Sequence, residues 1–90
     1  MPKYLIRREV PGAATMTAEQ LRGMSERSNH AVDETGGLQW VHTYVTDDRL
    51  FCVYIAVDES RIREHAQRGG FPCDEITRIH TIIDPVTGEG

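Results

Sequence analysis

The sequence predicts an α+β fold in which a four-stranded antiparallel sheet carries two helices on one face. Three observations indicate this fold. Two segments dense in β-branched and aromatic residues, 38–45 and 50–57, follow one another across a short polar turn. Helical periodicity lies on either side of this pair, in residues 17–35 and from 58 to about 68. Strand-forming segments at 3–9 and 75–83 flank the two helical ones.

The first strand and the first helix are predicted from short sequence features. The segment 3–9, KYLIRRE, is rich in strand formers, and Pro11-Gly12 ends it. Thr17 and Gln20 have the spacing of a capping box, so the helix is expected to begin after Thr17. Gly36 supplies the left-handed residue that ends it.

The remaining elements are a hairpin, a second helix and a last strand. The segments LQWVHTYV and LFCVYIAV are expected to pair as an antiparallel hairpin across residues 46–49. Asp58 or Ser60 can cap a helix that runs to about Arg68 before Gly69-Gly70, and EITRIHTII (75–83) reads as a strand. This βαββαβ order is the ferredoxin-like plan, so residues 1–90 are expected to form one ferredoxin-like domain with one uncovered sheet face.

Alternation along the strands predicts which side chains lie on that uncovered face. It places five residues there: Trp40, His42, Tyr44, Cys52 and Tyr54. The four other than His42 form the expected ligand pocket. The grouping requires a hairpin loop of odd length, because a two-residue Asp47-Asp48 loop would pair His42 with Val53. His80 is expected to share this face with Arg78. Since such an apolar face rarely stays exposed, the sequence predicts a homodimer that encloses a cavity.

The composition restricts the partners. The chain has 90 residues, a formal charge of −4 and a single lysine, so nucleic acid is an unexpected partner. No apolar run is long enough to span a membrane, and MPKYLIRREV lacks the apolar region of a signal peptide, which predicts a cytoplasmic protein without membrane contact. Cys52 and Cys73 are expected to be unpaired in that compartment.

Histidines are the candidate metal ligands. His30 and Glu34 stand at i,i+4 on the first helix, with Glu26 and Asp33 nearby, and such a face can hold a divalent ion such as nickel or zinc. The alternative is an ordinary solvated helix face. The full set of candidate metal residues is His30, Glu34, His42, His65 and His80. A buried structural histidine is the competing interpretation of His42, and the chain has neither zinc-finger spacing nor an H-E-x-x-H motif.

Four stretches together resemble a bacterial family of small domains of unknown function with a nickel-binding member, typified by a Streptomyces nickel-binding protein. These stretches are Trp40–Asp48, Cys52–Ala56, Arg63–Ala66 and Gly70–Pro72. The resemblance extends from Tyr4–Gly12 to Ile83–Thr87. It implies a ferredoxin-like dimer that binds nickel, and it assigns no ligand residues.

The leading hypothesis is therefore a small dimeric nickel-binding protein, with other divalent transition metals left open. One alternative is a small-ligand enzyme of the dimeric α+β barrel type, in which His42 and Tyr44 act as acid and base. Because no catalytic motif occurs in the sequence, a non-catalytic role is favoured over an enzyme. A third possibility is a module whose open face only dimerises.

Overall fold

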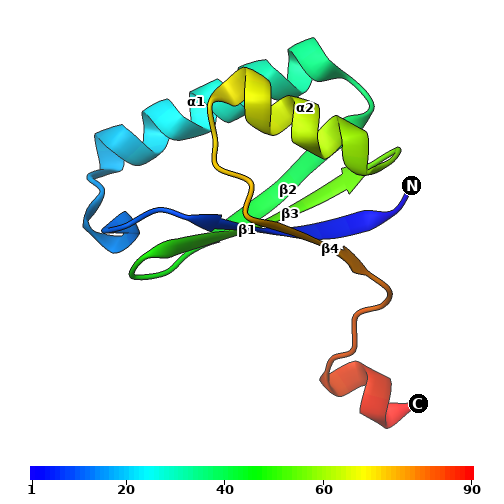
Figure 1. Cartoon of the computed structure of the whole chain (residues 1–90). Coiled ribbons are helices and arrows are strands. Elements are labelled where there is room, and N and C mark those ends of the chain that lie inside the picture. The colour runs from blue at the N-terminus through cyan, green and yellow to red at the C-terminus, as the bar shows by residue number, and fades with distance from the viewer.

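The computed structural model describes residues 1–90 and confirms the predicted fold. The strands are β1 (Lys3–Glu9), β2 (Leu38–Val45), β3 (Arg49–Ala56) and β4 (Glu75–Ile79), and the helices are α1 (Ala18–Thr35) and α2 (Glu59–Gly69). Two short 3-10 turns, η1 (Ala13–Thr15) and η2 (Pro85–Glu89), complete the chain. The strands form one antiparallel sheet in the order β2-β3-β1-β4, and both helices cover the same face of it (Figure 1).

The ends of both helices follow from local chemistry. The Thr17 hydroxyl accepts from the Gln20 amide at 3.1 Å, and the Gln20 side chain accepts from the Thr17 amide at 2.9 Å, which is the predicted capping box. The Asp58 carboxylate caps α2 by accepting from the Arg61 amide. Gly70 ends α2 at φ 70°, where a residue with a Cβ would be strained.

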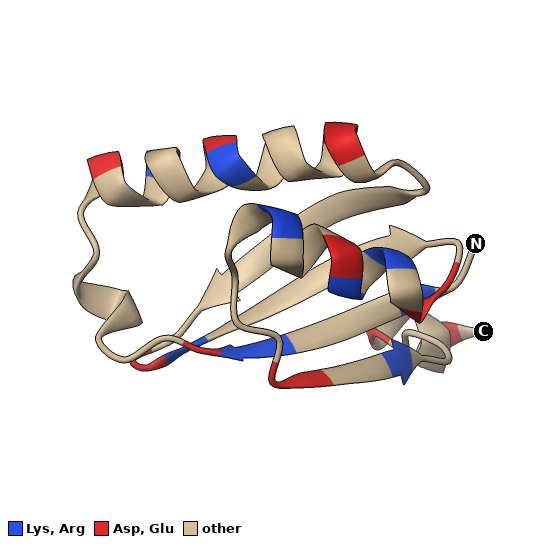
Figure 2. Ribbon diagram, turned by 45° about the horizontal axis from the view of Figure 1, so that its top comes forward, with Lys and Arg blue, Asp and Glu red and all other residues tan.

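Charged residues occur along both helices (Figure 2). Neither helix combines the length and the apolar composition that crossing a membrane requires. The inner sides of the helices and the sheet enclose the core. Its buried apolar members are Tyr4, Ile6, Ala13, Leu38, Leu50, Cys52, Tyr54, Ala56 and Ile62.

The β2–β3 hairpin has the two-residue loop that breaks the predicted grouping. Thr46 and Arg49 face each other across Asp47-Asp48, with the Thr46 amide donating to the Arg49 carbonyl at 2.9 Å. As a result His42 pairs with Val53. The register then shifts between Trp40 and His42, so that Val41 is the extra residue of a β-bulge and Trp40 pairs with Tyr54.

The turn and the bulge together overturn the predicted membership of the uncovered face. A bulge residue reverses the alternation on one side of it, so Trp40 faces the helices whereas His42 and Tyr44 face away from them. Cys52 and Tyr54 also face the helices, where they are 3% and 2% exposed. Five residues predicted to share one face are therefore divided between the two.

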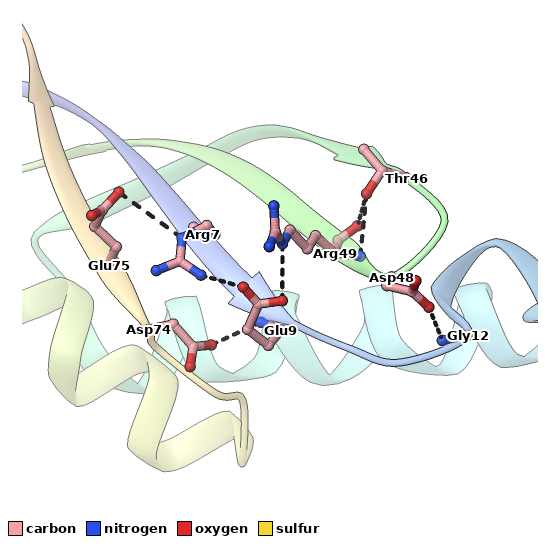
Figure 3. Close-up of polar contacts among 8 residues, drawn as sticks. All are labelled: Arg7, Glu9, Gly12, Thr46, Asp48, Arg49, Asp74 and Glu75. Atoms are coloured by element: carbon pink, nitrogen blue, oxygen red, sulfur yellow. Dashed lines mark hydrogen bonds and ion pairs between the residues drawn. The ribbon is translucent and has the colours of Figure 1, made fainter.

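The uncovered face instead carries an apolar centre with charged residues at one end. Its apolar members are Leu5, Tyr44, Phe51, Val53, Ile55 and Ile79, placed there by the strand register. At the charged end Arg7 lies between Glu9 and Glu75, and Arg49 donates to Glu9 at 3.0 Å (Figure 3). Opposite charges thus balance within this end of the sheet.

The last strand is shorter than predicted. β4 ends at Ile79, which pairs with Lys3, the first residue of β1. Residues beyond Ile79 have no strand left to pair with, so the segment 80–90 leaves the sheet and runs away from the body on the side opposite the helices (Figure 1). His80 consequently lies in this exposed segment, and Arg78 pairs with Tyr4 on the helix-covered face, so neither occupies the predicted position on the uncovered face.

Candidate functional site

A cavity of about 440 Å³ lies between α1 and the sheet. Four residues of α1 form part of its wall. The bulged part of β2 adds Trp40 on the inner side of the cavity and Val41 and His42 at its rim. The full lining is Arg8, Leu21, Met24, Ser25, Ser28, Trp40, Val41, His42, Thr43, Val45, Leu50, Cys52, Tyr54 and Phe71. The volume is within the range of small-molecule sites.

Arg8 is the most unusual residue of this cavity. It lies on the helix-covered face opposite Leu50 and is only 1% exposed. Its Nη1 donates to the Pro72 carbonyl oxygen, but its Nη2 is buried without a hydrogen-bond partner. Its guanidinium lies 5.3 Å from the Phe71 ring centre and 5.9 Å from that of Tyr54, so aromatic faces provide part of its environment.

The protonation of Arg8 and Tyr54 follows from these surroundings. Burial alone would lower the pKa of Arg8, but Tyr54 and Cys52 beside it raise that pKa above its ordinary value. Burial raises the pKa of Tyr54 by more than the charge of Arg8 lowers it. At neutral pH the cavity therefore holds a guanidinium cation next to a neutral phenol.

His65 lies behind the cavity wall and is fully buried. Its Nε2 is 3.3 Å from both the hydroxyl and the carbonyl oxygen of Ser28, and Nδ1 has no partner. Its ring stacks on Phe71 at 5.7 Å and tilts against Tyr54 at 5.0 Å. Burial, together with the charge of Arg8, lowers the pKa of His65 to about 4, so the imidazole is neutral at pH 7.

The structure brings together three of the four predicted pocket residues. Trp40, Cys52 and Tyr54 all line the cavity, and the Trp40 indole donates to the Thr43 hydroxyl at 2.9 Å. Tyr44 is on the other face of the sheet, 58% exposed, with its ring edge-to-face with His42 at 4.8 Å. The pocket is thus on the helix-covered side and does not include Tyr44.

Sequence reasoning missed Arg8 as a site residue. Its burial could have been predicted from the sequence, because Tyr4, Ile6 and Arg8 are every second residue of β1 and share one face. A charged residue in that series signals a buried cation, which is rare without a functional or structural partner. Ser28 is the partner of His65, and nothing in its spacing along α1 distinguishes it as such.

The predicted metal residues are dispersed. His30 and Glu34 lie on the exposed face of α1, His42 lies on the uncovered sheet face, His65 lies in the core and His80 lies beyond β4. No three histidine, cysteine, aspartate or glutamate side chains form a group that could hold a metal ion. The predicted histidines therefore do not converge within one chain.

His30 and Glu34 are in contact. His30 Nε2 lies 2.8 Å from Glu34 Oε1, and both side chains are accessible, at 77% and 45% exposure. Glu34 Oε2 is also 3.5 Å from an Arg68 nitrogen on α2. The pair therefore presents an imidazole and a carboxylate to solvent, with one arginine competing for the carboxylate.

Comparisons with known proteins agree with this fold. The crystal structure of SCO4226 from Streptomyces coelicolor A3(2) is similar, with a TM-score of 0.75 and 14% sequence identity over 90% of this chain and 99% of that one. At this identity the likeness shows the fold alone. None of the curated proteins compared with this chain matches it. The family described as nickel responsive protein SCO4226-like matches residues 4–79, from the first strand to the last. The chain therefore belongs to the SCO4226-like family of nickel responsive proteins.

Proposed function

We propose that this protein binds nickel through His30 and Glu34 on α1. The observation that supports this most directly is the 2.8 Å distance between His30 Nε2 and Glu34 Oε1. Two adjacent ligands of a first-row divalent ion, each about 2.1 Å from it, lie roughly 3 Å apart. The two donor atoms already have this spacing, and the family's nickel responsiveness supports nickel as the ion.

The chemistry of the pair fits the ion. Imidazole nitrogen suits nickel, and a carboxylate supplies charge. Both side chains are exposed, so water can complete the coordination of an ion held by only two protein atoms. Arg68 opposes binding, because it pairs with Glu34 Oε2 and places a positive charge beside the site.

Isothermal calorimetry with Ni²⁺ tests this proposal. We expect His30→Ala and Glu34→Gln each to weaken binding by at least 10-fold, whereas Arg68→Gln strengthens it. His80→Ala is the matched control, since His80 is exposed but remote from α1 along the chain. Unchanged affinity in both α1 variants, or an equal loss in the His80 variant, would rule out this site.

We further propose that the protein is a cytoplasmic homodimer formed through the uncovered sheet face. Its apolar centre includes Phe51 and Tyr44, and no element of the same chain covers it (Figure 1). The segment after β4 leaves on this side with Ile82, Ile83 and Val86 exposed by 64%, 77% and 69%. A second copy of the chain would remove both apolar surfaces from water. The unpaired Cys52 and Cys73 support a reducing compartment.

Sedimentation velocity tests the dimer. Phe51→Glu places a charge on the uncovered face between Tyr44 and Arg7, and an interface would bury it, so we expect the variant to be a monomer. Val57→Glu is the control, because Val57 is 51% exposed but lies beyond the end of β3. A wild-type protein that sediments as a monomer at high concentration contradicts the proposal, as does a Phe51→Glu variant that remains dimeric.

A further inference from the structure

Two adjacent arginines of β1 have opposite electrostatic situations. Arg7 lies on the uncovered face, where Glu9 and Glu75 pair with it (Figure 3). Arg8 lies on the helix-covered face at 1% exposure, and no carboxylate forms an ion pair with it. A buried cation without a counter-charge is costly, and folded proteins rarely keep one unless something pairs with it.

The surroundings of Arg8 supply polar contacts but no negative side chain. The Pro72 carbonyl oxygen accepts a hydrogen bond from Nη1, and the rings of Phe71 and Tyr54 lie near the guanidinium. Nη2 remains a buried donor without a partner, in a residue that lines the 440 Å³ cavity. None of the residues lining this cavity is aspartate or glutamate. The missing counter-charge can therefore come from a molecule inside the cavity.

We propose that the cavity between α1 and the sheet binds a small organic carboxylate whose charged group pairs with Arg8 and whose apolar body lies against α1. The guanidinium fork matches a carboxylate in geometry. Leu21 and Met24 of α1, with Trp40 opposite, provide an apolar wall for the rest of the ligand.

The charge count favours a carboxylate over a phosphate. Arg8 is the only cationic side chain in the lining, so it balances one negative charge. A phosphate group at neutral pH carries close to two charges and would leave one uncompensated in a mostly apolar cavity. This site is separate from His30 and Glu34, neither of which lines the cavity.

The experiment compares an acid with its neutral analogue of the same shape. The full-length protein is titrated with 4-phenylbutyrate and with 4-phenylbutyramide, and amide chemical shifts are followed by NMR. We expect the acid to shift cavity residues and to bind 10- to 100-fold more tightly than the amide, which is the range for hydrogen bonds to charged groups. Equal affinity of the two compounds, or no binding of the acid, overturns the proposal.

Substitutions of Arg8 test whether this residue causes the preference for the acid over the amide. Arg8→Met keeps an apolar stem of similar length without the charge, and we expect it to reduce the acid preference to less than 2-fold. Arg8→Lys keeps the charge without the fork and should retain a reduced preference, so it decides the question if Arg8→Met fails to fold. Arg27→Met is the matched control, because Arg27 lies 5.1 Å from the Phe71 ring but does not line the cavity. A preference of wild-type size in Arg8→Met, or in Arg8→Lys if Arg8→Met fails to fold, contradicts the assignment.

The histidine behind the cavity gives an independent readout. The charge of Arg8 contributes to the lowered pKa of His65, so an anion paired with Arg8 should raise that pKa. Imidazole chemical shifts recorded against pH, with and without 4-phenylbutyrate, measure this change. The carboxyl group of the probe is itself partly protonated near pH 4, so the probe concentration is set to keep its anion saturating across the titration. An unchanged His65 titration under that condition contradicts pairing of the anion with Arg8.

Discussion

Charged side chains are accommodated differently on the two faces of the sheet. On the uncovered face Arg7, Glu9, Glu75 and Arg49 neutralise one another at the end of the strands, in contact with water (Figure 3). On the helix-covered face Arg8 is alone, held by a carbonyl oxygen and two aromatic rings. Side chains of neighbouring residues on one strand thus enter unrelated environments. The difference agrees with the two proposals, a ligand site on the covered face and an association surface on the uncovered one.

The largest expected effect separates the two faces by their contribution to folding. Ile6 is fully buried beneath the helices, whereas its neighbour Leu5 is half-buried on the uncovered face. We expect Ile6→Ala to lower the free energy of unfolding by about 2–5 kcal/mol, because it leaves a cavity in the core. Leu5→Ala should cost clearly less in a monomeric background such as Phe51→Glu. Urea denaturation measures both, and equal losses would mean that the covered face is not the principal core.

A second experiment uses the buried histidine. The pKa of His65 in the folded chain is about 4, below the ordinary 6.5, so between these values the unfolded chain takes up a proton that the folded chain does not. Stability is therefore fully present above pH 6.5 and is lost as the pH falls towards 4, by on the order of 3 kcal/mol.

The expected measurement is a series of urea denaturations between pH 7 and pH 4. His65→Leu should flatten the slope in this range. Ile62→Val is the control, since it weakens the same core while keeping His65. A His65→Leu variant with the slope of the Ile62→Val variant would show that another group causes the acid sensitivity.

A third test concerns the bulge that divides the two faces. Deleting Val41 leaves Trp40 opposite Tyr54 and His42 opposite Val53, because Val41 has no partner in the ladder. We expect this deletion to cost about 1 kcal/mol or less, because both pairings survive and the Trp40–Thr43 hydrogen bond is the main contact disturbed. Deleting Thr43 should be more damaging, since it removes the acceptor of the Trp40 indole and puts His42 opposite Cys52 on the covered face. Thermal denaturation compares the two, and equal losses would contradict the assigned register.

The smallest effect belongs to the charged end of the uncovered face. The closest Arg7–Glu75 approach is 4.0 Å, and Glu75 is 61% exposed. Such a pair contributes little, so Glu75→Gln should change the free energy of unfolding by less than about 0.5 kcal/mol. Thermal denaturation at low and high salt checks this. A decrease of more than about 1 kcal/mol in the free energy of unfolding would mean that this exposed pair stabilises the fold as much as a buried pair does.

The sequence predicted the elements well because their determinants are local. The capping box at Thr17 and Gln20 and the glycines after each helix act over a few residues, and all are present in the structure. The density of β-branched residues likewise predicted β2 and β3. The overestimated length of the last strand has a nonlocal cause, since β4 stops where its partner β1 begins at Lys3.

The structure groups the predicted pocket residues differently. Trp40, Cys52 and Tyr54 line one cavity, but that cavity is on the opposite face from the one predicted. The two-residue turn placed His42 and Tyr44 opposite Val53 and Phe51, on the other face from Cys52 and Tyr54. The bulge at Val41 then returned Trp40 to the face of Tyr54, and period-two alternation contains no information about such an insertion.

By itself the sequence determined the order of the elements, the ends of the helices and the family, because these depend on local propensity and on residue identity along the chain. The tertiary structure alone decided which side chains meet. The two-residue turn and the bulge at Val41 set the register of β2, and that register placed Trp40 against Tyr54 and His42 in the open. The segment after α2 then covered Arg8 with Phe71 and the Pro72 carbonyl, and no carboxylate forms an ion pair with it. Its unpaired charge arises from how distant segments come together.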